Sequence, residues 1–135
     1  MRCAVDMMQR LGRMNERLVE ELRSPIQMGI GIHTGLAIVG TMGPPKTPIL
    51  SAVGDTVNTT ARLEGMSKEL GKPIVVSVQT LDAAGFPTDI VVQHVQVRGR
   101  SEEIAVATFE ADELAAMLPT SQPQDRRKQM APAAS

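Results

Sequence analysis

Glycines alternate with isoleucines from Gly29 to Ile32, and this pattern constrains the fold more than any other feature of the chain. A period of two is typical of a β-strand, whose successive side chains point to opposite faces of a sheet. One face of this strand would be apolar and the other bare, and a bare face lets a second backbone or a ligand come close. Two β-type segments are predicted here, residues 27–35 and residues 36–40, with a tight turn or kink at Gly35.

Hydrophobic periodicity and breaker residues divide the rest of the chain into further helices and strands. Apolar residues three or four apart predict an amphipathic helix over residues 3–23, which Pro25 ends. Asp55 is expected to cap a second helix over residues 56–70, with Gly71 as its stop. The other predicted elements are strands over residues 48–53, 73–78, 90–97 and 104–109, a helical turn over 79–84, a loop over 43–47 and a hairpin turn over 98–103.

This order of elements predicts an α+β fold with a mostly antiparallel sheet and helices on one face. A length of 135 residues fits one small domain. We expect residues 1–115 to form that domain. Residues 116–135 are rich in proline, serine, glutamine and charge, and we expect them to be a disordered tail because they cannot bury enough apolar surface.

The composition excludes several classes of function. A net charge of −1 and only two aromatic residues, Phe86 and Phe109, argue against a nucleic-acid partner. Cys3 is the only cysteine, so no internal disulfide can form, and this favours a reducing compartment. No apolar run approaches the length of about 18 residues that a transmembrane helix needs. We therefore expect a soluble cytoplasmic protein without a membrane segment in this chain.

Asn58 and Arg62 are the candidate functional side chains of the second predicted helix. They are four residues apart, so they share one face of the helix. Arg offers a fixed fork for phosphate oxygens, and Asn can donate and accept toward a sugar. On an arbitrary helix, a surface Asn and a solvated Arg are the commoner interpretation. Two apolar strips are expected to grip this helix on either side of that face, one formed by Val57 and Ala61 and the other by Leu63, Met66 and Leu70.

Three motifs change that interpretation, because together they resemble the signature of the class III adenylate and guanylate cyclases. They are GIGIHTGLAIVG over residues 29–40, VGDTVNTTARLE over residues 53–64 and VRGR over residues 97–100. They follow the family's order and spacing, and the resemblance covers roughly residues 1–110. It implies a partial ferredoxin-like cyclase fold, the C-terminal part of the catalytic domain, with the first strands of the domain missing.

The resemblance also implies roles for single positions. Asn58 corresponds to the asparagine that orients the ribose, and Arg62 to the arginine that stabilises charge on the α-phosphate as the 3′-hydroxyl attacks. Arg100 corresponds to the basic residue that contacts the terminal phosphates, with Arg98 as the other candidate. Ser51 falls where the family reads the purine. Many members carry Asp there, whereas some bacterial adenylate cyclases carry Thr or Ser, so Ser51 favours ATP over GTP.

The metal site of the family is not expected in this chain. Members hold two metal ions, Mg²⁺ or Mn²⁺, on two aspartates of the domain's first half. None of the aspartates here lies in that apolar strand setting, and Asp55 is interpreted as a helix cap. We therefore expect no metal ligands in this chain and no activity from it alone. His33 lies within a motif, but a structural role is expected for it rather than a catalytic one.

Two hypotheses of different classes follow. In the first, the parent domain makes cyclic AMP and pyrophosphate from ATP in signal transduction. The family's active sites lie at a dimer interface, so this chain would supply one side of a composite site, as a homodimer or with a complementary cyclase subunit. In the second, the chain is a non-catalytic dimerisation or regulatory module, or a truncated relic of a cyclase.

Overall fold

A four-stranded sheet forms the centre of the fold, with its strands in the order β1-β4-β6-β5. The computed structural model describes residues 1–44, 46–87, 89–96 and 103–118. The strands are β1 (Ile30–Ile32), β4 (Ile74–Ser77), β5 (Gln93–Gln96) and β6 (Glu103–Phe109). In this sheet β1 and β4 pair in parallel, and β6 pairs antiparallel with both β4 and β5. The predicted α+β class and the mostly antiparallel sheet are confirmed.

The helices cover both faces of this sheet, which corrects the expectation that they lie on one. Alternate residues of β4 separate the two sides: Ile74 and Val76 belong to one core cluster, and Val75 belongs to the other. Because successive strand residues face opposite ways, the two clusters lie on opposite faces. The first cluster includes residues of α1 (Arg2–Arg17), α3 (Val78–Ala83) and α4 (Ala111–Met117), and the second includes Leu63 of α2 (Asp55–Gly65).

The bare face of the glycine-rich strand is the surface on which α2 packs. A Cβ added to Gly31 would lie 2.5 Å from the backbone nitrogen of Glu64, and one added to Gly29 would clash with Ser67. No side chain fits between these two backbones. The prediction that the glycines admit a second backbone is therefore confirmed, and that backbone belongs to α2.

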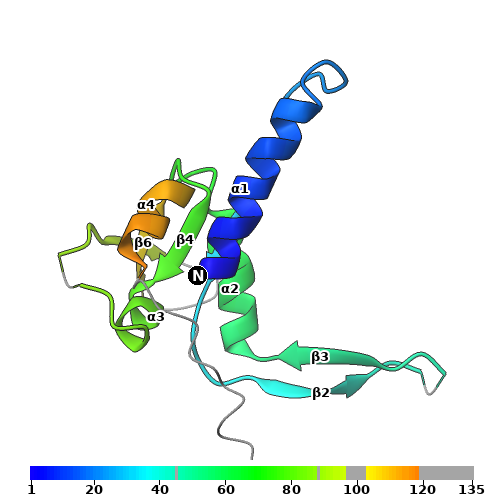
Figure 1. Ribbon diagram of the computed structural model, residues 1–135. Helices are drawn as coiled ribbons and strands as arrows, with labels where there is room; N and C mark the ends of the chain where they lie inside the picture. The colour runs from blue at the N-terminus through cyan, green and yellow to red at the C-terminus, as the bar shows by residue number, and fades with distance from the viewer. Residues whose placement is uncertain (45, 88, 97–102, 119–135) are drawn as a thin grey trace, which may run out of the picture.

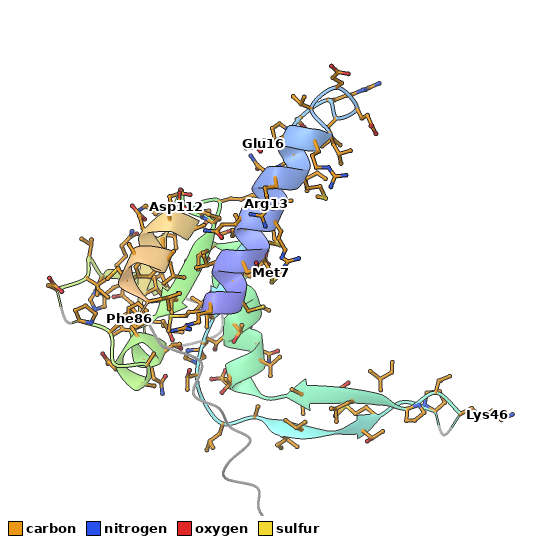
Figure 2. All side chains as sticks on the ribbon, viewed as in Figure 1. Met7, Arg13, Glu16, Lys46, Phe86 and Asp112 are labelled. Atoms are coloured by element: carbon orange, nitrogen blue, oxygen red, sulfur yellow. The ribbon has the colours of Figure 1, made fainter. Side chains whose placement is uncertain are left out.

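A two-stranded hairpin extends away from the sheet and its helices (Figure 1). It consists of β2 (Ile38–Met42) and β3 (Ile49–Val53), which pair antiparallel. Lys46 lies at its tip, far from the rest of the chain (Figure 2). Its apolar side chains lie largely in solvent: Leu50 is 74% exposed and Ile38 is 73% exposed.

Boundaries of the first two helices differ from the predictions. The first helix ends at Arg17 rather than near residue 23, because Asn15 both donates to the carbonyl of Ile26 and accepts from its amide, each at 2.9 Å. This pair of hydrogen bonds turns the chain back beside the helix. At α2, Gly54 is the N-cap and Asp55 is the first helical residue, so the predicted Asp55 cap is wrong. Asp55 instead places a negative charge in the first turn, where the helix dipole favours it.

Helix α2 also ends earlier than predicted, at Gly65 rather than near residue 70. Glycine is a poor helix former, and the chain continues from Met66 to Gly71 in turns. Helix α4 was not predicted at all. It begins with a capping box in which the Glu110 amide donates to Glu113 Oε2 at 2.8 Å, and it buries Leu114. Within the described residues, no helix is both long enough and apolar enough to span a membrane.

Candidate functional site

The junction between the hairpin and α2 positions the candidate site. Strand β3 ends at Val53 and α2 begins at Asp55, so only Gly54 separates them. Gly54 has a φ of 140°, a conformation that residues with side chains rarely adopt. The first turn of α2 is also tied to the residues before the hairpin, since Thr56 Oγ1 donates to the carbonyl of Leu36 at 2.6 Å. The start of the helix is therefore fixed from two directions.

Four exposed residues form a continuous strip along α2. Asn58, Ala61, Arg62 and Gly65 follow the spacing of one helix face, and all four are exposed. Thr59 and Leu63, by contrast, are 0% exposed and turn toward the sheet. We call Asn58, Ala61, Arg62 and Gly65 the α2 strip. The sequence-based prediction that Asn58 and Arg62 share one face is consistent with this arrangement.

The polar groups of the α2 strip are not engaged by the rest of the described chain. Neither the side-chain amide of Asn58 nor the Arg62 guanidinium forms a hydrogen bond or ion pair with a residue in residues 1–44, 46–87, 89–96 or 103–118. The other two members are small, and a Cβ added to Gly65 would meet nothing within 4 Å. The strip can thus present a cation and an amide to a ligand without first breaking internal bonds.

The expected grip on α2 from two sides is corrected to a grip from one side. Leu63 is buried, and Met66 and Leu70 pack against its cluster, as predicted. Ala61, however, is exposed, and Val57 is only half-buried. In the described chain the hairpin extends away from α2 instead of covering this side (Figure 1).

The other two predicted contact residues are placed differently. Ser51 is half-buried in the middle of β3, opposite Gly40 of β2. The neighbouring pairs on its face of the hairpin, Ile38 with Val53 and Met42 with Ile49, are apolar and exposed. Ser51 is therefore a hydroxyl in an uncovered apolar surface, apart from the α2 strip. Arg100 and its alternative Arg98 lie outside the described residues.

No group of three or more His, Cys, Asp or Glu side chains within the described ranges could hold a metal ion. Asp6 pairs with Arg10 at 2.8 Å, and Asp55 lies in the first turn of α2. The donor set that the structure describes does not fit the two-ion site that the family resemblance implies. The expectation that this chain lacks metal ligands stays a prediction.

A hydrogen-bonded group of side chains at the ends of β1 and β4 escaped the sequence analysis. His33 Nδ1 lies 2.9 Å from Ser77 Oγ, and Ser77 Oγ lies 2.9 Å from Thr80 Oγ1. Thr80 Oγ1 in turn donates to Thr34 Oγ1 at 3.0 Å. The partners of His33 and Thr34 are 44 and 46 residues away, so no local pattern could have indicated them. We call these four residues the His33 network.

A hollow lies between α1, the end of α2 and the segment before β1. It has a volume of about 950 Å³ and is lined by apolar side chains such as Met8, Leu11 and Met28. Its lining includes Gly65 but neither Asn58 nor Arg62. The hollow therefore adjoins the α2 strip without containing its polar groups.

Comparison with known proteins places these features in a family. The model of the adenylate and guanylate cyclase catalytic domain matches residues 1–109. Adenylate cyclase 1 of Rhizobium meliloti is 38% identical over 76 residues, which are 56% of this chain and 11% of that protein. The adenylate cyclase of Anabaena cylindrica is 32% identical over 90 residues, which are 64% of this chain and 18% of that protein. The chain thus spans less than a fifth of either relative.

Among solved structures, the guanylyl cyclase Cya2 is similar with a TM-score of 0.66 and 30% sequence identity. The match covers 78% of this chain and 53% of that one. The similar proteins therefore include both adenylate and guanylate cyclases, and all of these three are longer than the matched region.

Proposed function

Because this chain belongs to the adenylate and guanylate cyclase catalytic domain family, we propose that it supplies one side of a composite site converting ATP to cyclic AMP and pyrophosphate. The observation that carries the proposal is the α2 strip. Asn58 and Arg62 lie one turn apart, exposed and unengaged by the described chain, with small neighbours that leave room for a nucleotide.

In the proposed reaction, the ribose 3′-hydroxyl oxygen bonds to the α-phosphorus. The bond from that phosphorus to its bridging oxygen breaks, pyrophosphate leaves, and the hydroxyl proton is lost to water. Asn58 would orient the ribose so that its hydroxyl is in line for attack. Arg62 would stabilise the negative charge that develops on the α-phosphate, as a positioned donor does in other phosphoryl transfers. The Asn58 and Arg62 roles can be separated by single substitutions.

Ser51 supports ATP as the purine nucleotide, with GTP as the less favoured substrate. A serine hydroxyl can donate one hydrogen bond and can also accept, whereas an ionised aspartate only accepts. In the family, aspartate at this position is common, and serine or threonine occurs in a group of bacterial adenylate cyclases. Arg100 is the proposed contact to the terminal phosphates. ATP as substrate, together with the lone Cys3, favours a cytoplasmic location.

The second side of the site would come from another chain. Two divalent ions, Mg²⁺ or Mn²⁺, would activate the attacking hydroxyl and offset phosphate charge when bound to that second side. The partner is a second copy or, better suited to this chemistry, a complementary cyclase subunit that bears the metal-binding aspartates. We expect residues 1–135 alone to make no cyclic AMP above background with either ion.

The test mixes the chain with a cyclase subunit that keeps its metal aspartates but lacks its own Asn/Arg pair. Cyclic AMP formation should exceed that of either protein alone. Asn58→Ala and Arg62→Ala should each lower the rate in the mixture by roughly a hundredfold, the usual scale for removing one transition-state donor. Rescue that survives both substitutions would contradict the assignment of these two residues.

Two exposed side chains outside the α2 strip provide matched controls. Lys68→Ala removes a cation just beyond the end of α2, and Gln79→Ala removes an exposed amide from α3. Both variants should rescue as the unaltered chain does. If Lys68→Ala were as damaging as Arg62→Ala, the loss would reflect general charge near the helix rather than a specific phosphate contact.

A non-catalytic binding module is the second candidate, and the exposed apolar hairpin supports it. A hairpin of this kind suits association with another chain whether or not catalysis follows. In the mixing experiment, stable binding to the cyclase subunit without any gain in cyclic AMP would favour this module over the composite site.

A further inference from the structure

The His33 network lies on the same face of the sheet as α2. Glycines 29 and 31 contact α2, and His33 continues their alternation along the strand direction. Ser77 is paired across the sheet with Val106, which belongs to the α2-side core cluster. Ser77 itself is 0% exposed, and Thr80 is 6% exposed. Ser77 and Thr80 are thus buried hydroxyls, which are stable only if their hydrogen-bonding capacity is used, whereas His33 is half-buried and Thr34 is exposed.

Counting donors and acceptors fixes the direction of each bond in the network. Each hydroxyl has one hydrogen to donate. Thr80 Oγ1 gives its hydrogen to Thr34 Oγ1, so the bond between Ser77 and Thr80 must use the hydrogen of Ser77. Ser77 Oγ also accepts from the Thr80 amide at 3.3 Å, as the N-cap of α3. Its remaining bond, to His33, can therefore only be one in which His33 Nδ1 donates.

The backbone that this network holds leads directly to the start of α2. Gly35 and Leu36 follow Thr34, and the Leu36 carbonyl accepts the hydrogen bond of Thr56 Oγ1 at 2.6 Å. Gly35 packs so closely on Thr56 that an added Cβ would lie 2.5 Å from Thr56 Oγ1. Thr56 is two residues before Asn58, and its own carbonyl accepts from Thr60 Oγ1 at 2.8 Å. A short series of hydrogen bonds and backbone contacts therefore connects the His33 imidazole to the first turn of α2.

We infer that His33 is a positioning residue: through Ser77, Thr80 and Thr34 its Nδ1–H fixes residues 33–36, and through Thr56 these residues fix the direction in which α2 presents Asn58 and Arg62. The positioning role rests on the proposed function, because the alignment of Asn58 and Arg62 affects the reaction only if these residues contact a nucleotide. The assignment of the Nδ1–H hydrogen does not depend on catalysis. The two parts can therefore be tested separately.

The first test is spectroscopic and uses the full chain without a partner. The ring-nitrogen signals of the two histidines are recorded by ¹H–¹⁵N correlation at alkaline pH. His33 should show a protonated Nδ1, which is the minor tautomer of a free histidine. His94 is exposed on β5 and is the internal control, expected to show mainly protonated Nε2. A protonated Nε2 on His33 would overturn the inference.

The second test uses the cyclase mixture and compares two substitutions of His33. His33→Leu removes the donor, and it should lower kcat by roughly tenfold because small misplacements of catalytic groups are costly. The KM for ATP should change by less than about twofold, since the contacting residues remain. His33→Asn keeps an N–H donor near the Nδ1 position, and it should restore kcat to within about threefold of the unaltered chain.

Two further variants separate positioning from loss of stability. Asn15→Ala breaks the hydrogen bonds of the α1 turn, away from α2, and should leave kcat unchanged even where it lowers Tm. Thr56→Val removes the bond to Leu36 at nearly constant volume and should lower kcat as His33→Leu does. The combined variant should lose less than the product of the two single losses, because both act along one chain of contacts.

The outcomes distinguish the inference from the proposed function. If the unaltered mixture makes no cyclic AMP, the proposed function fails, while the tautomer of His33 still tests the network. If the mixture is active and His33→Leu lowers kcat no more than Asn15→Ala does, the positioning role is refuted. It is also refuted if His33→Asn is as defective as His33→Leu.

Discussion

Asn58 and Arg62 are exposed because their neighbours divide the surface of α2 between the sheet and the solvent. Thr59 and Leu63 fill the buried side, and Asn58 and Arg62 lie on the exposed side. We therefore expect Asn58→Ala and Arg62→Ala to change the free energy of unfolding by less than about 0.5 kcal/mol. Leu63→Ala, on the buried side, should cost about 2–5 kcal/mol. Urea unfolding of the three variants is the measurement, and a large loss for Arg62→Ala would indicate a structural role instead.

Ser51 carries the prediction about nucleotide choice. If its hydroxyl reads adenine, Ser51→Asp should alter the ratio of kcat/KM for ATP to that for GTP, measured in the mixture with the complementary subunit. Ser51→Thr keeps the hydroxyl and should leave the ratio within about threefold of the original. An unchanged ratio in Ser51→Asp would remove this residue from the purine contact.

Glu113 provides a prediction about acid stability. The hydrogen bond from Lys72, at 2.6 Å, and then the bond from the Glu110 amide lower the pKa of Glu113 below its usual value. A lowered pKa in the folded state stabilises the fold above the usual Glu pKa, and this contribution disappears as the pH falls through the lowered value. The Tm difference between the unaltered chain and Glu113→Gln should therefore shrink as the solution is made acidic. A difference that stayed constant across the acid range would contradict the ion-pair explanation.

At the scale of elements, the contact between α2 and the glycine-rich strand β1 holds the α2 strip in position on the sheet. Gly31→Ala would force the two backbones apart, because the new Cβ would lie 2.5 Å from the nitrogen of Glu64. We expect a loss of about 1–3 kcal/mol in unfolding free energy, the usual cost of overpacking. Gly12→Ala on α1 is the matched control: its Cβ would meet nothing within 4 Å, and it should stabilise the helix by about 0.5–1 kcal/mol. Equal effects of the two substitutions on urea unfolding would contradict the close packing.

The elements that could be predicted from the sequence are those whose signals are local. The alternation at Gly29 and Gly31 predicted both a strand and a close approach, and the structure confirms both. The separation of four residues between Asn58 and Arg62 was enough to predict that they share one helix face. Helix α4 was missed because each of its sequence signals is weak. Its N-cap is Glu110, an unusual capping residue, and its buried face is mainly Leu114.

Features that depend on distant residues could not be predicted. The early end of α1 depends on Asn15 meeting the backbone of Ile26. The His33 network depends on residues of β4 and α3 that are more than forty positions away. The placement of α2 on the opposite face from the other helices depends on the strand order, which periodicity within one segment does not contain.

At the scale of the whole molecule, the exposed hairpin predicts association. Its apolar side chains occupy both of its faces, since Ile38 and Leu50 belong to different cross-strand layers. Large apolar patches of this kind mark interaction surfaces. We expect a dimer or larger species in sedimentation velocity at high micromolar concentration, and a clean monomer would contradict this. Ile38→Thr combined with Leu50→Thr should weaken the association while preserving strand propensity.

A control for association is available elsewhere on the surface. Val91 is 82% exposed but lies outside the hairpin, in the segment before β5. Val91→Thr should leave the sedimentation profile unchanged. If it weakened association as much as the hairpin variant does, the contact would be a general effect of exposed apolar residues and not of the hairpin.

The open space beside Gly65 predicts different results when substitutions at this position are selected for folding and for activity. Within the described chain, nothing occupies the space beside it, and alanine is the better helix former by about 1 kcal/mol. A library of substitutions at Gly65 sorted only for folded protein should therefore enrich alanine and tolerate larger residues. The same library sorted for cyclic AMP made in the mixture should retain glycine, because a nucleotide or partner would need the vacant space. A difference between the residues enriched at position 65 in the two selections would show that the nucleotide or the partner, and not folding, requires glycine there.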